Sequence, residues 1–464
     1  MRARSDDEQG KGEVKMSVDM SRHFTTTELV RYALPSIAMM LFTSIYGIVD
    51  GLFVSNCTGK TAFAAVNLIL PFVMILSSFG FMVGTGGTAL ASRARGEGDP
   101  EKANRLFSLF VYFTLVVGVV VSIAGALAME WVARSFGATG ELLDMAVLYG
   151  RISMISLAMF MLQNVFQAFF SAAGKPNYGL YVTVTAGVVN MVLDAVLIGI
   201  FDLGVVGAAS ATVCAEFIGG GVPLIYFARK GNTSFFRLGA TRFDLAALGR
   251  CCVNGSSEMM TSIATSVVSM AYNLQLMALV GEDGVAAYGM IMYVVLVFAA
   301  VFMGYNIGTS PLMSYQHGAG NSREKRSIFR KSLLVVAVFG VCMLGLAQAT
   351  AGPISFAFTG YDADLYAFTE HAFRVYSLSF VLIGFSMYGS ALFTSLGNGL
   401  VSAVISFLRT LVFEIGSVML LPLVLGADGI WFSVLVAEVA SVLVTTGFLL
   451  YLGPTYGIWG KSGK

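Results

Sequence analysis

Nine ionisable side chains interrupt long stretches of this chain that are otherwise free of charge. They are Asp50, Arg151, Asp194, Glu216, Glu258, Arg374, Arg409, Glu414 and Glu438. An ionisable group inside an apolar segment is costly to bury, and it is retained where it binds an ion, a proton or an oppositely charged partner. These nine residues are therefore the first candidates for chemistry.

Four residues among these stretches carry oxygen atoms that we expect at one depth. In membrane-spanning helices, Asp50 lies ~30 Å and Asp194 ~24 Å from one side, whereas Thr212 lies ~10 Å from the other. Asn190 and Asp194 are four residues apart, so they share one helix face. Two carboxylates with amide and hydroxyl oxygens form either a hard-oxygen site for Na⁺ or a proton acceptor. The alternative for Asp50 is that it only reaches the polar interface at its helix end.

The composition predicts an all-helical membrane protein. Of 464 residues, 56% are hydrophobic and only 12% are charged, whereas a soluble domain carries roughly a quarter charged residues. A span needs ~20 apolar residues, and the charge-free stretches and their glycine-rich breaks yield twelve such helices. We expect them near residues 29–54, 61–91, 105–129, 142–172, 178–201, 205–228, 249–280, 285–315, 327–351, 365–396, 400–424 and 429–453.

The distribution of basic residues predicts how these helices are oriented. With the N-terminus inside, the inner segments hold 23 Lys and Arg residues, and the outer segments hold only Lys60 and Arg134. This bias is the positive-inside signal, so we expect both termini in the cytoplasm and the chain in a bacterial inner membrane. Residues 1–28 form a polar tail that is not a cleavable signal.

The two halves of the chain repeat each other. Gly96 and Gly318, Gly204 and Gly426, and Glu216 and Glu438 are each separated by 222 residues. A duplicated unit of six helices enters the membrane twice in the same direction, which predicts parallel repeats around a central cleft. We expect an N-lobe at 29–228, an inter-lobe linker at 229–248, a C-lobe at 249–453 and a cytoplasmic tail at 454–464.

The repeat leaves several readings of the other acids open. Glu216 and Glu438 are equivalent, which favours a structural role, such as pairing with Arg151 or Arg374, as much as a functional one. Glu258 has no acidic equivalent in the first helix, which makes it a candidate for substrate binding.

Two further charged residues, Arg409 and Glu414, are expected to form an internal ion pair. Catalysis has little support, because the three histidines lie in the tail or near helix ends and no hydrolase or metalloprotease motif is present. We therefore expect no enzyme activity and no metal beyond a coupling ion.

Several motifs resemble the multidrug and toxic compound extrusion (MATE) family, and most closely its bacterial MepA-like and DinF-like branch. They are the run 48–51 (IVDG) after a helix with Pro35, Pro71, the run 84–99 (GTGGTALASRARGEGD) and the run 190–194 (NMVLD). The resemblance implies a cation-coupling site at Asp50, Asn190, Asp194 and Thr212 with the Ala208 backbone nearby. It implies a hinge at Pro35 and an acidic C-lobe position at Glu258. In one branch of the family a second acid in helix 10 accompanies this position, but residues 374–393 of this chain contain no acid.

These features together predict an antiporter that exports drugs or amphipathic organic cations by alternating access. The coupling ion is H⁺ or Na⁺, and no other cofactor is expected. The partners are small-molecule substrates and membrane lipids rather than nucleic acid, and the expected state is a monomer. The alternative is a lipid-linked oligosaccharide flippase of the related superfamily. An intramembrane enzyme or scaffold is a further alternative from a different class.

Overall fold

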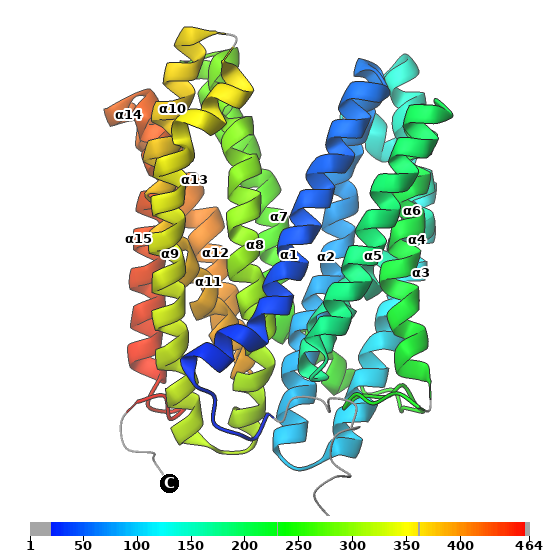
Figure 1. Ribbon diagram of the computed structural model, residues 1–464, viewed down its shortest axis with the longest axis vertical. Coiled ribbons are helices and arrows are strands. Elements are labelled where there is room, and N and C mark those ends of the chain that lie inside the picture. Colours follow the sequence, from blue (N-terminus) through cyan, green and yellow to red (C-terminus); the bar gives the residue numbers. More distant parts are fainter. Residues whose placement is uncertain (1–19, 230, 361, 460–464) are drawn as a thin grey trace, which may run out of the picture.

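Two helical bundles stand side by side in the computed structural model, which describes residues 20–229, 231–360 and 362–459 (Figure 1). The first bundle, the N-lobe, contains α1 (Thr26–Cys57), α2 (Lys60–Gly96), α3 (Pro100–Ser135), α4 (Gly140–Ala172), α5 (Pro176–Asp194), the π-helical segment η1 (Ala195–Ile200) and α6 (Gly204–Ala228). The second bundle, the C-lobe, contains α7 (Leu245–Leu279), α8 (Glu282–Gly318), α9 (Ser322–Thr359), α10 (Ala363–Ser377), α11 (Phe380–Ser395), α12 (Gly399–Phe407), the π-helical segment η2 (Leu408–Glu414), α13 (Ile415–Leu420), α14 (Pro422–Leu425) and α15 (Ala427–Leu452).

The helices are long enough to cross a membrane. Eleven spans meet this test on length and composition, and the α10 and α11 pair forms a twelfth that is bent by 44°. Within the described residues, no strand interrupts the helices. The prediction of an all-helical membrane protein with twelve spans is thus confirmed. Residues 1–19 and 460–464 of the two expected tails lie outside the described residues.

Local sequence explains where the helices begin. Asp99 accepts a hydrogen bond from the Lys102 amide at the start of α3, and Asn321 accepts one from the Glu324 amide at the start of α9. Such side chains satisfy amide groups that have no partner within the helix. Asp99 and Asn321 are 222 residues apart, so the cap is part of the repeat.

Three spans differ from the uniform helices expected at 178–201, 365–396 and 400–424. The first changes to the π-helical segment η1 directly after Asp194, and the third contains η2, which ends at Glu414. The span at 365–396 breaks between α10 and α11. The Ser377 and Ser379 hydroxyls donate to the carbonyls of Arg374 and Tyr376 there. These local hydrogen bonds compete with the helix ladder and favour a bend.

The lobes are closest at the lower end in Figure 1, where α3, α7 and α9 begin. The loops at this end are rich in Lys and Arg, and we call it the basic end. Glycines allow this approach. An added Cβ at Gly96 would lie 2.0 Å from the Tyr315 carbonyl oxygen, and one at Gly318 would lie 2.1 Å from the Arg93 oxygen. Tyr315 and Arg93 are themselves 222 residues apart, so α2 and α8 cross symmetrically. The bundles diverge towards the opposite end (Figure 1).

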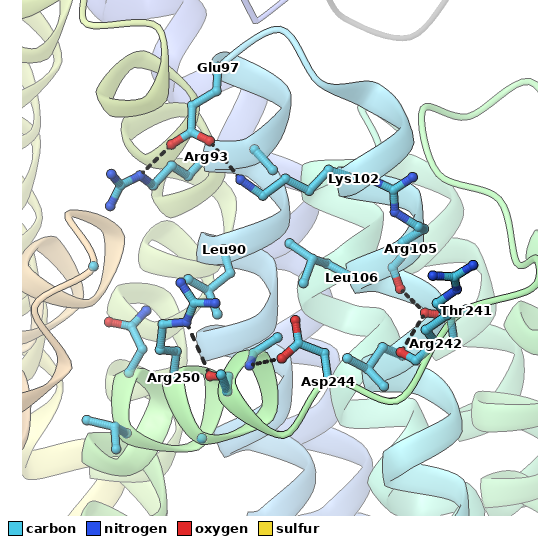
Figure 2. A pocket seen from close by; sticks show the side chains of 18 of the residues that line it. Leu90, Arg93, Glu97, Lys102, Arg105, Leu106, Thr241, Arg242, Asp244 and Arg250 are labelled. Atoms are coloured by element: carbon cyan, nitrogen blue, oxygen red, sulfur yellow. Dashed lines mark hydrogen bonds and ion pairs between the residues drawn. The ribbon is translucent and has the colours of Figure 1, made fainter.

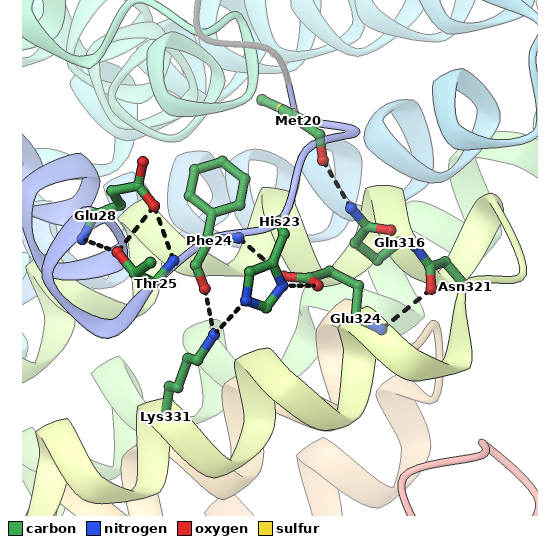
Figure 3. A network of polar contacts seen from close by, with 9 residues as sticks. All are labelled: Met20, His23, Phe24, Thr25, Glu28, Gln316, Asn321, Glu324 and Lys331. Atoms are coloured by element: carbon green, nitrogen blue, oxygen red, sulfur yellow. Dashed lines mark hydrogen bonds and ion pairs between the residues drawn. The ribbon is translucent and has the colours of Figure 1, made fainter.

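The chain before α1 ties the N-lobe to the C-lobe at the basic end (Figure 3). His23 Nδ1 lies 2.6 Å from a Glu324 carboxylate oxygen, and the Phe24 amide donates to the other oxygen at 3.1 Å. Lys331 Nζ donates to the Phe24 carbonyl, and Gln316 donates to the Met20 carbonyl. These bonds join the start of α1 to α8 and α9.

Candidate functional site

The structure brings two of the predicted N-lobe residues, Asp50 and Asp194, together. Asp50 on α1 and Asp194 on α5 have carboxyl groups close enough for one to hydrogen bond to the other when a proton is shared. Asp194 is fully buried, Asn190 is 2% exposed and Ala208 is 1% exposed. Helices α1, α5 and α6, which carry these residues, pack against one another inside the N-lobe.

The oxygens of this cluster lack donors. Asp50 Oδ1, Asn190 Oδ1 and both carboxylate oxygens of Asp194 are buried without a hydrogen-bond donor among the described residues. The Thr212 hydroxyl, which donates to the Ala208 carbonyl at 3.1 Å, keeps its lone pairs for a further partner. Buried acceptors without donors are costly, so this arrangement suits a bound proton or cation.

Glu216 belongs to the same cluster, although the sequence argument kept its role open. Its charge interacts with that of Asp50, and the Ser156 hydroxyl on α4 lies close to it. The expected partner Arg151 is exposed and forms no ion pair with Glu216 among the described residues. The sequence held a signal for this position, because Ala208, Thr212 and Glu216 follow each other at intervals of four and share one face of α6.

The C-lobe interior is arranged around Arg409. The Arg409 Nε and Nη2 atoms both lie 2.7 Å from one carboxylate oxygen of Glu438. Their side chains are 17% and 3% exposed, so this ion pair is mostly withdrawn from solvent. The other Glu438 oxygen has no donor among the described residues.

Two sequence-based pairings are wrong. The expected ion pair of Arg409 with Glu414 is replaced by Arg409 with Glu438, and Glu414 contributes only a charge nearby. Arg374 does not reach Glu438, because it pairs with Glu370 at 2.7 Å on its own helix. Partner choice depends on how each helix is rotated about its axis, and spacing along the chain does not fix that rotation.

Glu258 lies in a cavity between the two lobes. The N-lobe supplies part of α2 and α4, and the C-lobe supplies α7, α8, α11 and η2. The lining combines aromatic, thioether, hydroxyl and charged groups, among them Phe81, Thr85, Glu258, Met303, Asn306, Ser390 and Arg409. The cavity has a volume of about 100 Å³ in this conformation, and Glu258 is the acidic side chain among its lining residues.

Pro35 lies on α1 next to the lobe contact. The adjacent Ser36 and Ile37 backbones would lie 2.4–2.6 Å from a Cβ added at Gly304 of α8. Helix α1 continues through Pro35 from Thr26 to Cys57. A role as a hinge stays a prediction.

The family model MatE matches residues 35–196 and 259–419, one segment in each lobe. The chain belongs to the MATE family. It is therefore a multi-pass membrane transporter, and the match of one model to both lobes agrees with the duplication.

Relatives and solved structures agree with this membership. The multidrug export protein MepA of Staphylococcus saprophyticus subsp. saprophyticus is 27% identical over 424 residues, which cover 91% of this chain and 93% of the relative. A crystal structure of MATE in complex with MaL6 superposes with a TM-score of 0.89 at 22% identity, covering 96% of this chain and 99% of the other. An outward-facing multidrug resistance MATE transporter of the MOP superfamily gives the same TM-score, identity and coverage. This MATE chain thus shares its fold over almost its full length.

Proposed function

We propose that this MATE transporter is a cation-coupled antiporter of the bacterial inner membrane that exports drugs or amphipathic organic cations. The coupling ion is H⁺ or Na⁺. The observation that carries the proposal is the N-lobe cluster, in which Asp50 and Asp194 present oxygens without donors. The MepA relatives are multidrug export proteins, and they lend no support to a lipid-linked oligosaccharide flippase.

The proposed cation ligands fit either ion. Among the described residues, no group of three or more His, Cys, Asp or Glu side chains gathers at metal-binding distances. Na⁺ would therefore need Asn190 and Thr212 oxygens beside the two carboxylates, whereas H⁺ needs only the carboxyl pair. Both ions are cargo that crosses the membrane.

Coupling requires that the ion and the substrate prefer different conformations. With the basic end in the cytoplasm, the structure is closed towards the cytoplasm and its lobes diverge outwards. Cation binding at Asp50 and Asp194 from outside changes the packing of α1 against α5 and α6 and favours substrate release. Loss of the cation to the cytoplasm then resets the inward-open state, in which the inter-lobe cavity reloads.

Replacement of the two carboxyl groups tests this mechanism. We expect Asp50→Asn and Asp194→Asn to lower gradient-driven efflux of a fluorescent organic cation at least about tenfold, which corresponds to only about 1.4 kcal/mol of lost ion binding. The measurement uses sealed vesicles with an imposed H⁺ or Na⁺ gradient, and the gradient that drives efflux identifies the ion.

A matched control is available in the same lobe. Asp202 is exposed and has a positive φ of 51°, a conformation that Asn also tolerates. Asp202→Asn therefore repeats the chemical change outside the cluster, and we expect unchanged efflux. Normal gradient-driven efflux by both cluster variants, at equal protein levels in the membrane, contradicts the assignment.

A further inference from the structure

A second cavity opens at the basic end and shares no lining residue with the inter-lobe cavity that contains Glu258. Its volume is about 1170 Å³, and it lies between the α2–α3 turn, the inter-lobe linker, the start of α7 and the turn before α12. The linker joins α6 to α7 and contains Arg242. Both lobes contribute residues to the walls of the cavity. Five basic and two acidic side chains line it: Arg93, Lys102, Arg105, Arg242, Arg250, Glu97 and Asp244 (Figure 2).

The acids of the cavity are already engaged. Glu97 accepts hydrogen bonds from Arg93 at 3.0 Å and from Lys102 at 3.2 Å. Burial would raise the pKa of Glu97, but these hydrogen bonds outweigh it and hold the pKa below its ordinary value. Asp244 accepts a hydrogen bond from the Ala247 amide at the start of α7. Both acidic side chains of the cavity therefore already accept hydrogen bonds from groups of the protein.

Two arginines keep their charge available. Arg250 donates from Nε to the Ala246 carbonyl at 3.2 Å, and within the described residues neither it nor Arg242 has a carboxylate at ion-pair distance. Guanidinium groups bind phosphate through two parallel hydrogen bonds. The cavity thus has an excess of positive charge that suits an anionic phosphate group.

Exposed apolar side chains are neighbours of the cavity residues along the chain. Phe243 is 75% exposed, Leu245 is 72% exposed, and Val253 in the cavity wall is 55% exposed. Leu400, at the start of α12, is 68% exposed. In a membrane protein such residues beside a basic site contact the acyl chains, as in amphipathic segments at the bilayer surface. A free phosphate ion would not use them.

We propose that this cavity binds the headgroup of an anionic phospholipid, with Arg242 and Arg250 on the phosphate and with Phe243 and Leu245 against its acyl chains. Arg93, Lys102 and Arg105 belong to the N-lobe and Arg250 belongs to the C-lobe, so the lipid touches both lobes. It therefore binds the conformation closed at the basic end more tightly than an open one and shifts the protein towards it. This role differs from that of transported substrate and does not depend on the coupling ion.

Lipid binding to the purified full chain tests the proposal directly. Native mass spectrometry in detergent measures binding of phosphatidylglycerol and phosphatidylcholine. We expect a preference for phosphatidylglycerol, and we expect R242Q/R250Q to weaken its binding about tenfold or more, since each basic residue contributes appreciably to anionic lipid binding. R242K/R250K keeps the charge but not the bidentate geometry, so its binding should fall between that of the wild type and that of R242Q/R250Q. An unchanged unfolding temperature of R242Q/R250Q in detergent shows that its loss of binding is not caused by misfolding.

A matched control separates this cavity from general attraction of the basic end. Arg323 and Arg330 are both exposed on α9 outside the cavity, and R323Q/R330Q removes the same charge. Its phosphatidylglycerol affinity should equal that of the wild type. Equal loss in both double variants, or no loss in R242Q/R250Q, overturns the proposal.

The source of the phosphate group is tested separately. Inorganic phosphate at millimolar concentration should not displace phosphatidylglycerol, and F243S/L245S should weaken lipid binding without affecting folding in detergent. Displacement by inorganic phosphate overturns the lipid assignment. Spin labels at residues 177 and 323, on the two lobes at the basic end, should report shorter distances with phosphatidylglycerol than with phosphatidylcholine. Unchanged distances overturn the conformational role.

Discussion

The interiors of the two lobes hold the same number of acidic residues but differ in charge balance. Asp50, Asp194 and Glu216 form no ion pair in the described part of the N-lobe, whereas Glu258, Glu414 and Glu438 surround Arg409 in the C-lobe. The duplication kept the order of the spans, the caps at Asp99 and Asn321 and the close contacts at Gly96 and Gly318. The two interiors therefore differ by one basic residue, Arg409. It partly neutralises the acids of the C-lobe, whereas the acids of the N-lobe keep their negative charge available.

Packing explains why the N-lobe has no matching arginine. The helices α5 and α12 follow Gly174 and Gly397, which are 223 residues apart, so the N-lobe equivalent of Arg409 is Ala186. Ala186 is 2% exposed, and a Cβ added at the next residue, Gly187, would lie 2.6 Å from the Phe42 ring and 2.8 Å from the Tyr46 ring. Aromatic side chains of α1 thus occupy the space that a long side chain would need. The N-lobe acids therefore have no basic partner in the described part of that lobe.

The largest expected effect comes from breaking the C-lobe pair. Glu438→Gln removes the hydrogen-bonded partner of Arg409 and leaves a mostly buried guanidinium with only the weaker charge interactions of Glu258 and Glu414. Loss of one member of a buried pair costs about 3–5 kcal/mol, so we expect a clear drop in the thermal unfolding temperature in detergent. The equivalent change Glu216→Gln removes an acid without a basic partner and should leave stability unchanged or raised.

A double variant tests whether this pair acts only through stability. Replacing both Arg409 and Glu438 with Met and Leu should recover most of the stability, because a buried pair can be exchanged for apolar side chains at little cost. Equal destabilisation by Glu216→Gln and Glu438→Gln contradicts the difference in charge balance between the lobes.

A smaller effect is expected where the lobes are alike. Gly96→Ala and Gly318→Ala place equivalent methyl groups against equivalent carbonyls, at 2.0 and 2.1 Å before any adjustment. Overpacking of this kind costs about 1–3 kcal/mol, and both variants should lose similar stability in the same unfolding assay. Exposed Gly249→Ala, with nothing within 4 Å of the added Cβ, is the control. A loss confined to one of the two variants shows that α2 and α8 do not cross symmetrically.

Sequence reasoning reached the spans and the N-lobe cluster for physical reasons. Charge-free stretches reveal membrane helices because the bilayer excludes charge, and the turns of the helix place Asn190 and Asp194 on one face. It did not predict the pairing of Arg409 with Glu438 or the break at Ser377 and Ser379. The pairing depends on how the helices are rotated, and the break depends on local hydrogen bonds. Sequences of similar hydropathy can differ in both features.

The smallest effect is expected at Arg151 on α4 and Arg374 on α10, which occupy equivalent positions in the two repeats. The repeat suggested them as partners of the interior acids, but Arg151 is exposed and Arg374 pairs with Glu370 on the surface, with its side chain 44% exposed. An exposed pair contributes about 0.2–1 kcal/mol. Arg151→Gln should therefore leave the unfolding temperature unchanged, and Arg374→Gln should lower it slightly, with the loss reduced at high salt. Combining Arg374→Gln with Glu438→Gln should give the sum of the two losses, because the residues share no partner. A double variant that loses markedly less than this sum shows that Arg374 interacts with the C-lobe interior, and the charge balance of that lobe then depends on more than Arg409.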